Sequence, residues 1–219
     1  MFSPYLPPLP PLPGEGEEYE YVPPGRNLIS VLTDEHLRLE ALSAELVRTA
    51  EPRRELADVV TAAVTRHLSA EEQYLYPAVR ALLPDGDRIA DEEIGHDTEL
   101  LQQLAVLETA EPDSPAFKGL AEAVDAEILR HGRNCARHIF PRLGRAATEE
   151  DLVRLGNRLE IAEEAAPTRP HPGTPARPPW NKVVDPAVGM VDRLRDGLTG
   201  RKTFPEDLAD QPVEQSSGS

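Results

Sequence analysis

The sequence predicts an all-α protein: an up-down four-helix bundle followed by a short fifth helix, with Pro-rich ends that we expect to be largely disordered. Between residues 27 and 165, apolar residues recur at spacings of three and four, which is the pattern of helices that bury one face. Residues 67–77 (HLSAEEQYLYP) also align with residues 131–141 (HGRNCARHIFP) without a gap. The chain therefore contains two copies of a helical hairpin, and two such hairpins pack as a four-helix bundle.

Composition sets the domain organisation and excludes several functions. The 23 prolines cluster at the two ends, so we expect a tail at 1–25, the bundle at 26–165, and a linker and C-terminal tail at 166–219. The net charge of −16 argues against binding to nucleic acid or an anionic membrane. One cysteine excludes an internal disulfide framework, and neither a signal peptide nor a membrane-spanning run is present, so we expect a cytoplasmic protein.

The first hairpin is expected in two long helices. Residues 1–25 begin with a polyproline-type run and continue as an acidic coil; a solvated tail and a docking peptide for a protein partner are both open readings. The first helix should run from about 27 to 50, with His36 one turn from Leu32 on the core face. The second should run from about 52 to 83, and Pro77 inside it should kink it or tighten its end.

The second hairpin follows a break at residues 84–87. Its first helix, from about 88 to 109, is expected to turn His96 inward, whereas Glu92, Glu93 and Glu99 are read as solvated charges. A Pro-rich turn then starts the fourth helix, and one continuous core stripe is predicted on it: Phe117, Ala121, Val124, Ile128, His131, Cys135 and His138.

After the bundle, Thr148 is an N-cap followed by acidic first-turn residues, which predicts a fifth helix over about 149–165. Residues 167–179 should be a Pro-rich linker that contains His171. A short amphipathic helix is predicted over 186–200, with its apolar face made by Val188, Val191, Leu194 and Leu198.

The chemistry is concentrated at His67 and Glu71, which lie one turn apart on a core-facing helix. A carboxylate in a bundle core needs a charged partner or a metal, and imidazole beside carboxylate is a first-row metal half-site. In the second copy, His131 matches His67, Cys135 matches Glu71, and His138 matches Tyr74. Several histidines on neighbouring helices therefore favour a metal site over isolated core histidines.

This arrangement resembles the hemerythrin-like HHE cation-binding family over residues 27 to 165, in the form typical of actinobacterial members. The family pattern is one His on the first helix, His-x3-Glu on the second, one His on the third and His-x3-Glu on the fourth. The residues that match it in order are His36, His67, Glu71, His96 and His131. The resemblance implies that Glu71 bridges two irons and that the four histidines are terminal ligands. Cys135 departs from the pattern because it stands at the second bridging carboxylate.

Cys135 has three interpretations: a small buried apolar residue, a thiolate ligand that would favour zinc or a mixed-metal site, or a redox-active thiol. His138 is an alternative ligand one turn further along. Tyr74 and Glu99 are candidates for contacts with the ligands or with a metal-bound molecule.

The expected function follows from this donor set. Histidines with a bridging carboxylate in a helical bundle point to iron, two per chain, with zinc as the alternative. The small ligands expected are O2, NO or H2O2, in a binding protein or a di-iron peroxidase or other oxidoreductase. No catalytic residue beyond the metal ligands is assigned. The other functional class is a non-catalytic metal, oxygen or redox sensor or scaffold whose tails bind a protein partner.

Overall fold

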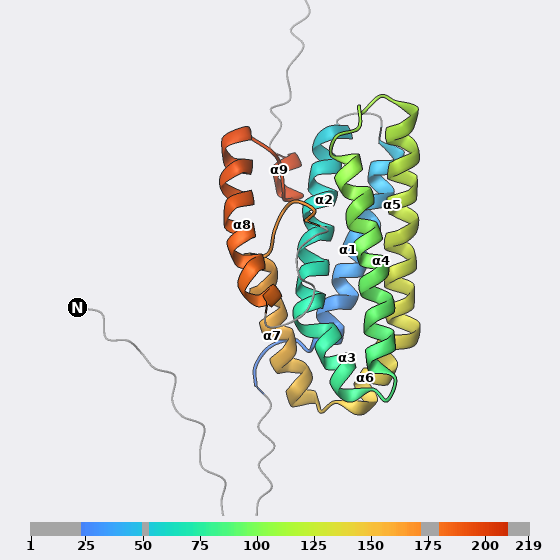
Figure 1. Cartoon of the computed structure of the whole chain (residues 1–219), viewed down its shortest axis with the longest axis vertical. Helices are drawn as coiled ribbons and strands as arrows, with labels where there is room; N and C mark the ends of the chain where they lie inside the picture. The colour runs from blue at the N-terminus through green and yellow to red at the C-terminus, as the bar shows by residue number, and fades with distance from the viewer. Residues whose placement is uncertain (1–22, 50–52, 172–179, 210–219) are drawn as a thin grey trace, which may run out of the picture.

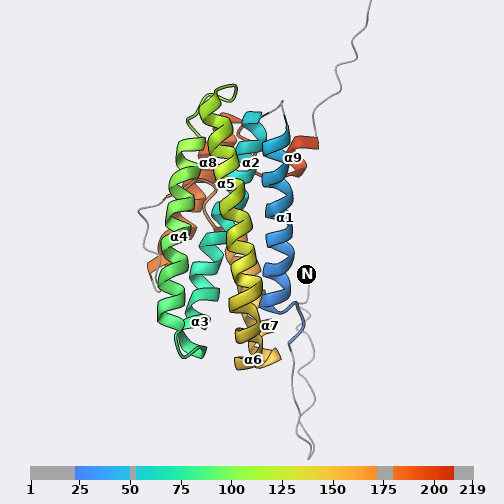
Figure 2. The ribbon, with the colours of Figure 1, turned by 90° about the vertical axis from the view of Figure 1, so that its right-hand side faces the viewer.

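The computed structural model describes residues 23–49, 53–171 and 180–209 of the chain, and in these ranges the regular secondary structure is entirely helical. Four long helices form the bundle, as predicted: α1 (Leu28–Arg48), α2 (Arg53–Ala70), α4 (Gly86–Leu107) and α5 (Pro115–Asn134). They run nearly parallel to the long axis of the molecule (Figures 1 and 2). Helix α1 packs against α2 and α5, and α4 packs against α5. Most of the predicted tail at 1–25 and the last ten residues lie outside the described ranges.

Side-chain caps set the starts of three helices. The side chains of Asn27, Ser114 and Thr148 accept hydrogen bonds from backbone N–H groups in the first turns of α1, α5 and α7 (Glu149–Ala165). The fifth helix, α7, has the bounds that the sequence predicts. It packs on α1 and α2, and a Cβ on its Gly156 would lie 2.2 Å from the carbonyl oxygen of Arg26. Glycine at this position therefore permits close approach to the start of α1.

Helices α2 and α5 do not continue as regular helices. Each passes through a five-residue π-helical turn, Glu71–Leu75 and Cys135–Ile139, into a short helix, α3 (Tyr76–Leu82) and α6 (Phe140–Ala146). The backbone N–H of Tyr76 donates to Glu71, five residues back, and that of Phe140 donates to Cys135. Both turns precede a proline, which has no N–H and whose ring crowds the carbonyl four residues back. Pro77 therefore accompanies a widened turn, not the kink or tightened end expected from the sequence.

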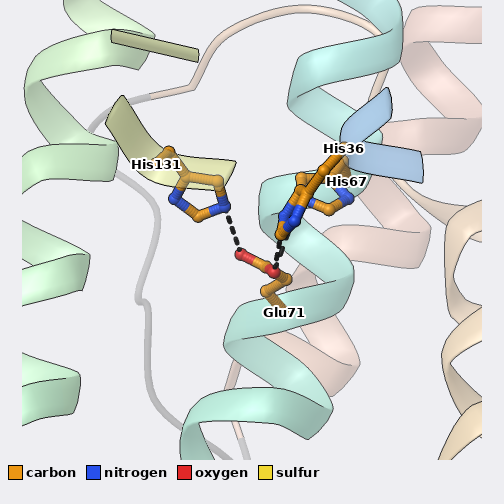
Figure 3. A group of neighbouring side chains, drawn as sticks. All are labelled: His36, His67, Glu71 and His131. Carbon is orange, nitrogen blue, oxygen red and sulfur yellow. Dashed lines mark ion pairs between the residues drawn. The ribbon is translucent and has the colours of Figure 1, made fainter. Parts of the chain in front are cut away.

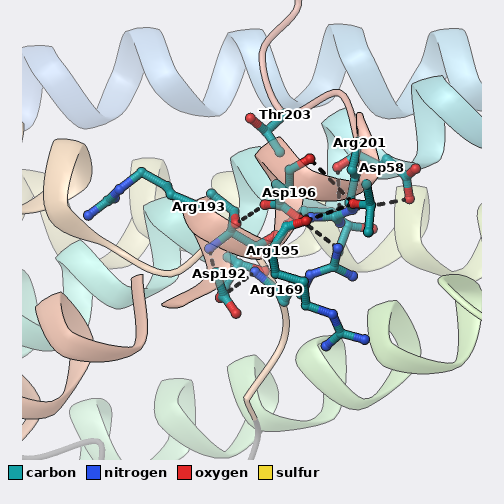
Figure 4. A network of polar contacts seen from close by, with 12 residues as sticks. Asp58, Arg169, Asp192, Arg193, Arg195, Asp196, Arg201 and Thr203 are labelled. Atoms are coloured by element: carbon teal, nitrogen blue, oxygen red, sulfur yellow. Dashed lines mark hydrogen bonds and ion pairs between the residues drawn. The ribbon is translucent and has the colours of Figure 1, made fainter. Parts of the chain in front are cut away.

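The C-terminal arm, residues 166–171 and 180–209, packs beside the bundle with α8 (Trp180–Thr199) against α7 (Figure 1). A buried ion network ties it down (Figure 4). Arg201, whose side chain is 5% exposed, pairs with Asp58 of α2 at 3.4 Å and with Glu108 at 2.7 Å. Asp196 of α8 pairs with Arg169 at 2.6 Å. Charged residues of α2, of the end of α4 and of the C-terminal arm are thus joined across long sequence separations.

Helix α8 differs from the sequence prediction in the residue at which it starts and in the face that it buries. It begins at Trp180, and its buried polar residues are Asp192 and Asp196, whereas Val191 and Leu198 are exposed. The apolar spacing predicts the helix correctly but not the side that packs, because paired carboxylates occupy the inward face. His171 lies outside the bundle, as expected for the linker, with Nε2 3.0 Å from Asp192. No helix within the described residues is long and apolar enough to cross a membrane.

The apolar core of the bundle is divided in two. One cluster, which includes Leu28, Leu32, Tyr76 and Cys135, fills the end near α3 and α6. The other, which includes Leu39, Leu68 and Ile128, fills the end where α4 and α5 are joined. Between them, all four helices place buried polar side chains at one level, and we call this set the polar layer: His36, His67, Glu71, Glu93, Asp97 and His131.

Candidate metal centre

Four residues of the polar layer converge on one point. His36 comes from α1, His67 from α2, Glu71 from the turn that follows α2, and His131 from α5 (Figure 3). Each offers one ligand atom, and these atoms all lie within 4.8 Å of one another. The four side chains are between 0% and 7% exposed, so the cluster is closed to bulk water.

The two oxygens of Glu71 face different histidines. Oε1 lies 3.5 Å from Nε2 of His36 and 3.4 Å from Nε2 of His67, whereas Oε2 lies 3.1 Å from Nε2 of His131. Figure 3 shows His36 and His67 together on one side of the carboxylate and His131 on the other. A carboxylate shared in this way has the arrangement of a bridge between two ligand groups.

The converging atoms lack hydrogen-bond partners. Nε2 of each of the three histidines and Oε1 of Glu71 are buried, and none makes a hydrogen bond of acceptable geometry within the described residues. Buried polar atoms are almost always satisfied, and an unsatisfied group calls for a specific explanation. Three imidazole nitrogens aimed at one carboxylate fit a bound metal cation in both donor type and position.

The electrostatics agree with a site that favours cations. Burial lowers the pKa of His36 from 6.5 to about 4 and also lowers that of His67, so both side chains are neutral and offer free lone pairs near neutral pH. Burial lowers the pKa of His131, but the charges of Glu71 and Asp97 outweigh this and raise it well above 6.5. Burial raises the pKa of Glu71, but the positive charge of His131 in turn holds it well below its usual value. An ionised carboxylate among imidazoles is a ready set of metal ligands.

Two of the histidines are supported from behind by carboxylates. Nδ1 of His67 lies 3.0 Å from Oε2 of Glu35 on α1. Nδ1 of His131 lies 3.4 Å from Oδ1 of Asp97 on α4. In each hairpin, a carboxylate side chain on the first helix thus lies behind a histidine on the second helix. Metal-binding histidines commonly donate their other ring N–H to such a group, which fixes the tautomer and the direction of the free nitrogen.

Tyr76 reaches the site because of the π-helical turn. In a π turn the residue five positions on, not four, bonds back to the start, so Tyr76 lies over Glu71. Its hydroxyl is 3.3 Å from Oε2 of Glu71 and also donates to Oδ2 of Asp97. Tyr76 is only 1% exposed. Burial, together with the charges of Asp97 and Glu71, raises its pKa well above 10 and keeps the hydroxyl protonated.

A cavity of about 480 Å³ lies on the other side of His67, between α1, α2, α7 and the C-terminal arm. Glu35, His67 and Glu163 line it and form a second group whose ligand atoms are close enough to hold a cation. Burial and the neighbouring carboxylate raise the pKa of Glu163 to about 8, and burial raises that of Glu35 to about 7. The two carboxyl groups are hydrogen-bonded to each other, so they share a proton near neutral pH.

The match to known proteins is consistent with this geometry. The model of the hemerythrin HHE cation-binding domain matches residues 27–143, more than half of the chain. The protein belongs to the hemerythrin HHE cation-binding family.

Individual relatives are distant. An uncharacterized hemerythrin-like protein of Schizosaccharomyces pombe is 22% identical over 134 residues, 61% of this chain and 66% of that protein. A DNA nickase of Nostoc is 23% identical over 139 residues, 63% of this chain and 39% of that protein. The chain thus spans less than two thirds of either relative. A crystal structure of an HHE cation-binding domain-containing protein from Mycobacterium kansasii has 20% identity and a TM-score of 0.56, and covers 64% of this chain and 86% of that one.

His96, the expected histidine of the third helix, is not in the cluster. Its side chain is 45% exposed, with Nδ1 3.6 Å from Glu93. The buried stripe of α4 instead runs through Ile89, Glu93, Asp97 and Leu100, and His96 lies one residue off it. One residue rotates a helix by about 100°, so the family pattern's histidine turns outward and Asp97 turns inward. Glu93, read as a solvated charge, is likewise buried.

Three further candidates lie away from the cluster. Tyr74 is partly buried and packs against the apolar core, while Tyr76 takes the expected place beside Glu71. His138, on the second π turn, is exposed, and so is Glu99 on α4. The position of His138 was projected on a regular helix, and that projection is wrong because the turn that contains the residue is π-helical.

Cys135 is fully buried within the apolar cluster at the α3 and α6 end and is not among the converging ligand atoms. Burial raises the pKa of its thiol well above 9, so the thiolate is disfavoured. This environment agrees with the interpretation of Cys135 as a small apolar core residue.

Sequence reasoning missed Asp97, Tyr76, Glu35 and Glu163. A signal for Asp97 was present, because Ile89, Glu93, Asp97 and Leu100 follow helical spacing. For Tyr76 the signal was weaker, since only the proline after it hints at an irregular turn.

Proposed function

We propose that this HHE-family protein binds iron at the His36, His67, Glu71 and His131 cluster as a non-heme di-iron site, with Glu71 as the bridging ligand. The observation that carries the proposal is the division of the Glu71 oxygens between two groups of histidines. His36 and His67 with Oε1 make one position, and His131 with Oε2 makes the other. Imidazole and bridging carboxylate in a helical bundle form a donor set that suits iron.

Such a site would supply binding of O2 or NO, or reaction with peroxide, because the chain offers fewer ligands than two irons can accept. The position beside His131 has fewer histidines than the position beside His36 and His67, so it has more room for an exogenous molecule. The apolar clusters above and below exclude bulk water from the site. Tyr76 places its protonated hydroxyl 3.3 Å from Oε2 of Glu71, beside the same position.

The first experiment is metal analysis of the full chain purified without an affinity-tag metal, together with its optical spectrum. We expect close to two irons per chain and the charge-transfer bands of a bridged ferric pair. Glu71→Gln should lose most of the iron, whereas Glu99→Gln, which changes an exposed carboxylate of the same bundle, should keep it. A protein that holds zinc alone, or no metal, would refute the di-iron proposal.

The second experiment asks what the site does. Iron-loaded protein is mixed with O2, NO or H2O2, and the spectrum and the consumption of each molecule are followed. A spectral change that reverses on removal of O2 or NO indicates a binding protein or sensor, and catalytic loss of peroxide indicates an enzyme. No response to any of the three would contradict the proposal.

A further inference from the structure

The side of the cluster that contains His131 is closed by a ring of four buried side chains. Tyr76 donates to Oδ2 of Asp97, and Oδ1 of Asp97 lies 3.4 Å from Nδ1 of His131. Nε2 of His131 lies 3.1 Å from Oε2 of Glu71, which is 3.3 Å from the Tyr76 hydroxyl. The four residues are between 0% and 3% exposed. No water-exposed group takes part in this ring.

We propose that Asp97 and Tyr76 are positioning residues for the metal site: Asp97 accepts the Nδ1–H of His131, and Tyr76 holds Asp97 in place. The inference rests on the proposed function, because it concerns how one of the proposed ligands is directed. With the Nδ1 proton engaged by Asp97, the lone pair of Nε2 faces the position beside Oε2 of Glu71. The negative charge of Asp97 also makes that nitrogen a stronger donor.

The structure of the other hairpin supports this role. His67 has a carboxylate behind Nδ1 in Glu35, and that carboxylate likewise comes from the preceding helix of the hairpin. The two arrangements differ in what holds the acid. Glu35 contacts Glu163 at the edge of a solvent-accessible cavity, whereas Asp97 is 1% exposed and is held by Tyr76. Two independent occurrences in one site make an accidental contact a poor explanation.

Some polar atoms in this ring of four side chains make no hydrogen bond. Oδ1 of Asp97 and both ring nitrogens of His131 make no hydrogen bond of acceptable geometry. The 3.4 Å separation between Oδ1 and Nδ1 is slightly longer than a good N–H···O bond. A small rotation of the imidazole toward a cation at Nε2 would not be opposed by any other hydrogen bond of the His131 ring. The carboxylate therefore guides the ring without locking it.

The test compares Asp97→Asn and Tyr76→Phe with two matched controls in the full chain. Tyr74→Phe removes the same hydroxyl from a tyrosine two residues earlier in the chain, and Glu99→Gln neutralises an exposed acid on the same helix as Asp97. Iron(II) titration under anaerobic conditions gives the stoichiometry and dissociation constants. Zinc-loaded protein labelled with ¹⁵N-histidine gives the Nδ1–H signal of His131 by NMR.

We expect Asp97→Asn to weaken one of the two metal equivalents about 10- to 100-fold and to leave the other unchanged. Tyr76→Phe should weaken the same equivalent by about 3- to 10-fold, because it removes one hydrogen bond but keeps the carboxylate. Both variants should shift the His131 Nδ1–H signal and make it exchange faster with water. The two controls should match the native protein in all three measurements.

Three outcomes would overturn the inference while the native protein still binds metal. In the first, the variants bind both metal equivalents as the native protein does. In the second, Asp97→Asn loses one whole equivalent and the His131 signal is unchanged, which makes Asp97 a ligand. In the third, binding of both equivalents weakens and the helical circular dichroism signal falls with it, which makes the role structural. If the native chain itself takes up no metal, the proposed function fails and this inference fails with it. Should Asp97→Asn not fold, Tyr76→Phe decides.

Discussion

Replacing Glu163 by Gln should change how the stability of the metal-free protein depends on pH. The carboxyl of Glu163 has its pKa raised from 4.5 to about 8, first by burial and then by the nearby charge of Glu35. The folded state therefore retains a proton that the unfolded chain has already released. A raised carboxyl pKa favours folding below about pH 4.5, and that contribution is lost as the pH rises toward 8.

The magnitude follows from the size of the shift. A rise from 4.5 to about 8 is worth at most about 5 kcal/mol, at about 1.4 kcal/mol per pKa unit. The side chain is 24% exposed and shares its proton with a second carboxyl, so we expect about 1 to 3 kcal/mol between pH 5 and pH 8. Glutamine cannot ionise, and its amide can donate to Glu35. The variant should therefore gain stability relative to the native protein as the pH rises.

The assay is urea denaturation of chelator-treated native protein and Glu163→Gln at pH 5, 6, 7 and 8. The lowered pKa values of His36 and His67 act in the opposite direction below about pH 6.5, in the case of His36 down to about pH 4, because the unfolded chain binds protons there that the folded chain does not. Both proteins contain these histidines, so the difference between the two curves reports Glu163 together with the groups coupled to it, Glu35 and His67. A difference that stays constant from pH 5 to pH 8 would refute the reasoning.

Other predictions concern the ligands, the thiol and the C-terminal arm. His67→Ala or His131→Ala should lower the iron content and remove the increase in melting temperature on iron loading. Deletion of residues 1–25 should alter neither quantity, and loss of metal on that deletion would place the tail in the site. Cys135→Ser should leave the iron spectrum unchanged and lower the free energy of unfolding, measured by urea denaturation, by about 1–3 kcal/mol, because a buried hydroxyl replaces an apolar thiol. Loss of an absorption band in this variant would make the thiolate a ligand. Arg201→Met should cost about 1–3 kcal/mol without reducing iron uptake, since it removes the ion pair of Asp58 and one of the two arginine partners of Glu108 and of Asp196. A loss below about 0.5 kcal/mol would contradict this.

Helical spacing and capping predicted much of the fold. The four long helices follow from apolar residues three and four apart, and the Thr148 cap predicted the start of the fifth helix. Spacing could not show which face of α8 packs, because the energy there comes from charge pairs between Asp196, Arg169 and Arg201. The residues that make those pairs lie far apart in the sequence, and nothing local identifies them as partners.

At the site, the residues that the repeat identified were easier to predict than the side chains placed by helical projection alone. His36, His67, Glu71 and His131 come together as the repeat suggested. Tyr76 could not be assigned by projection at 3.6 residues per turn, since the turn that begins at Glu71 is wider. The gapless alignment of the two halves concealed this, because both halves carry the same wide turn at the same place.

The polar layer has a consequence for cooperativity. It separates two apolar clusters that do not merge, so the metal-free protein is held together at this level by imperfect polar contacts. A cation bound there would link all the ligand-bearing helices and make the two ends of the bundle unfold as one unit. Without it, hydrogen exchange at the end that contains α3, α6 and the start of α7 would proceed through local opening, independently of the opposite end. Hydrogen exchange would then report metal binding: the two ends of the bundle would exchange together in the metal-bound protein and separately in the metal-free protein.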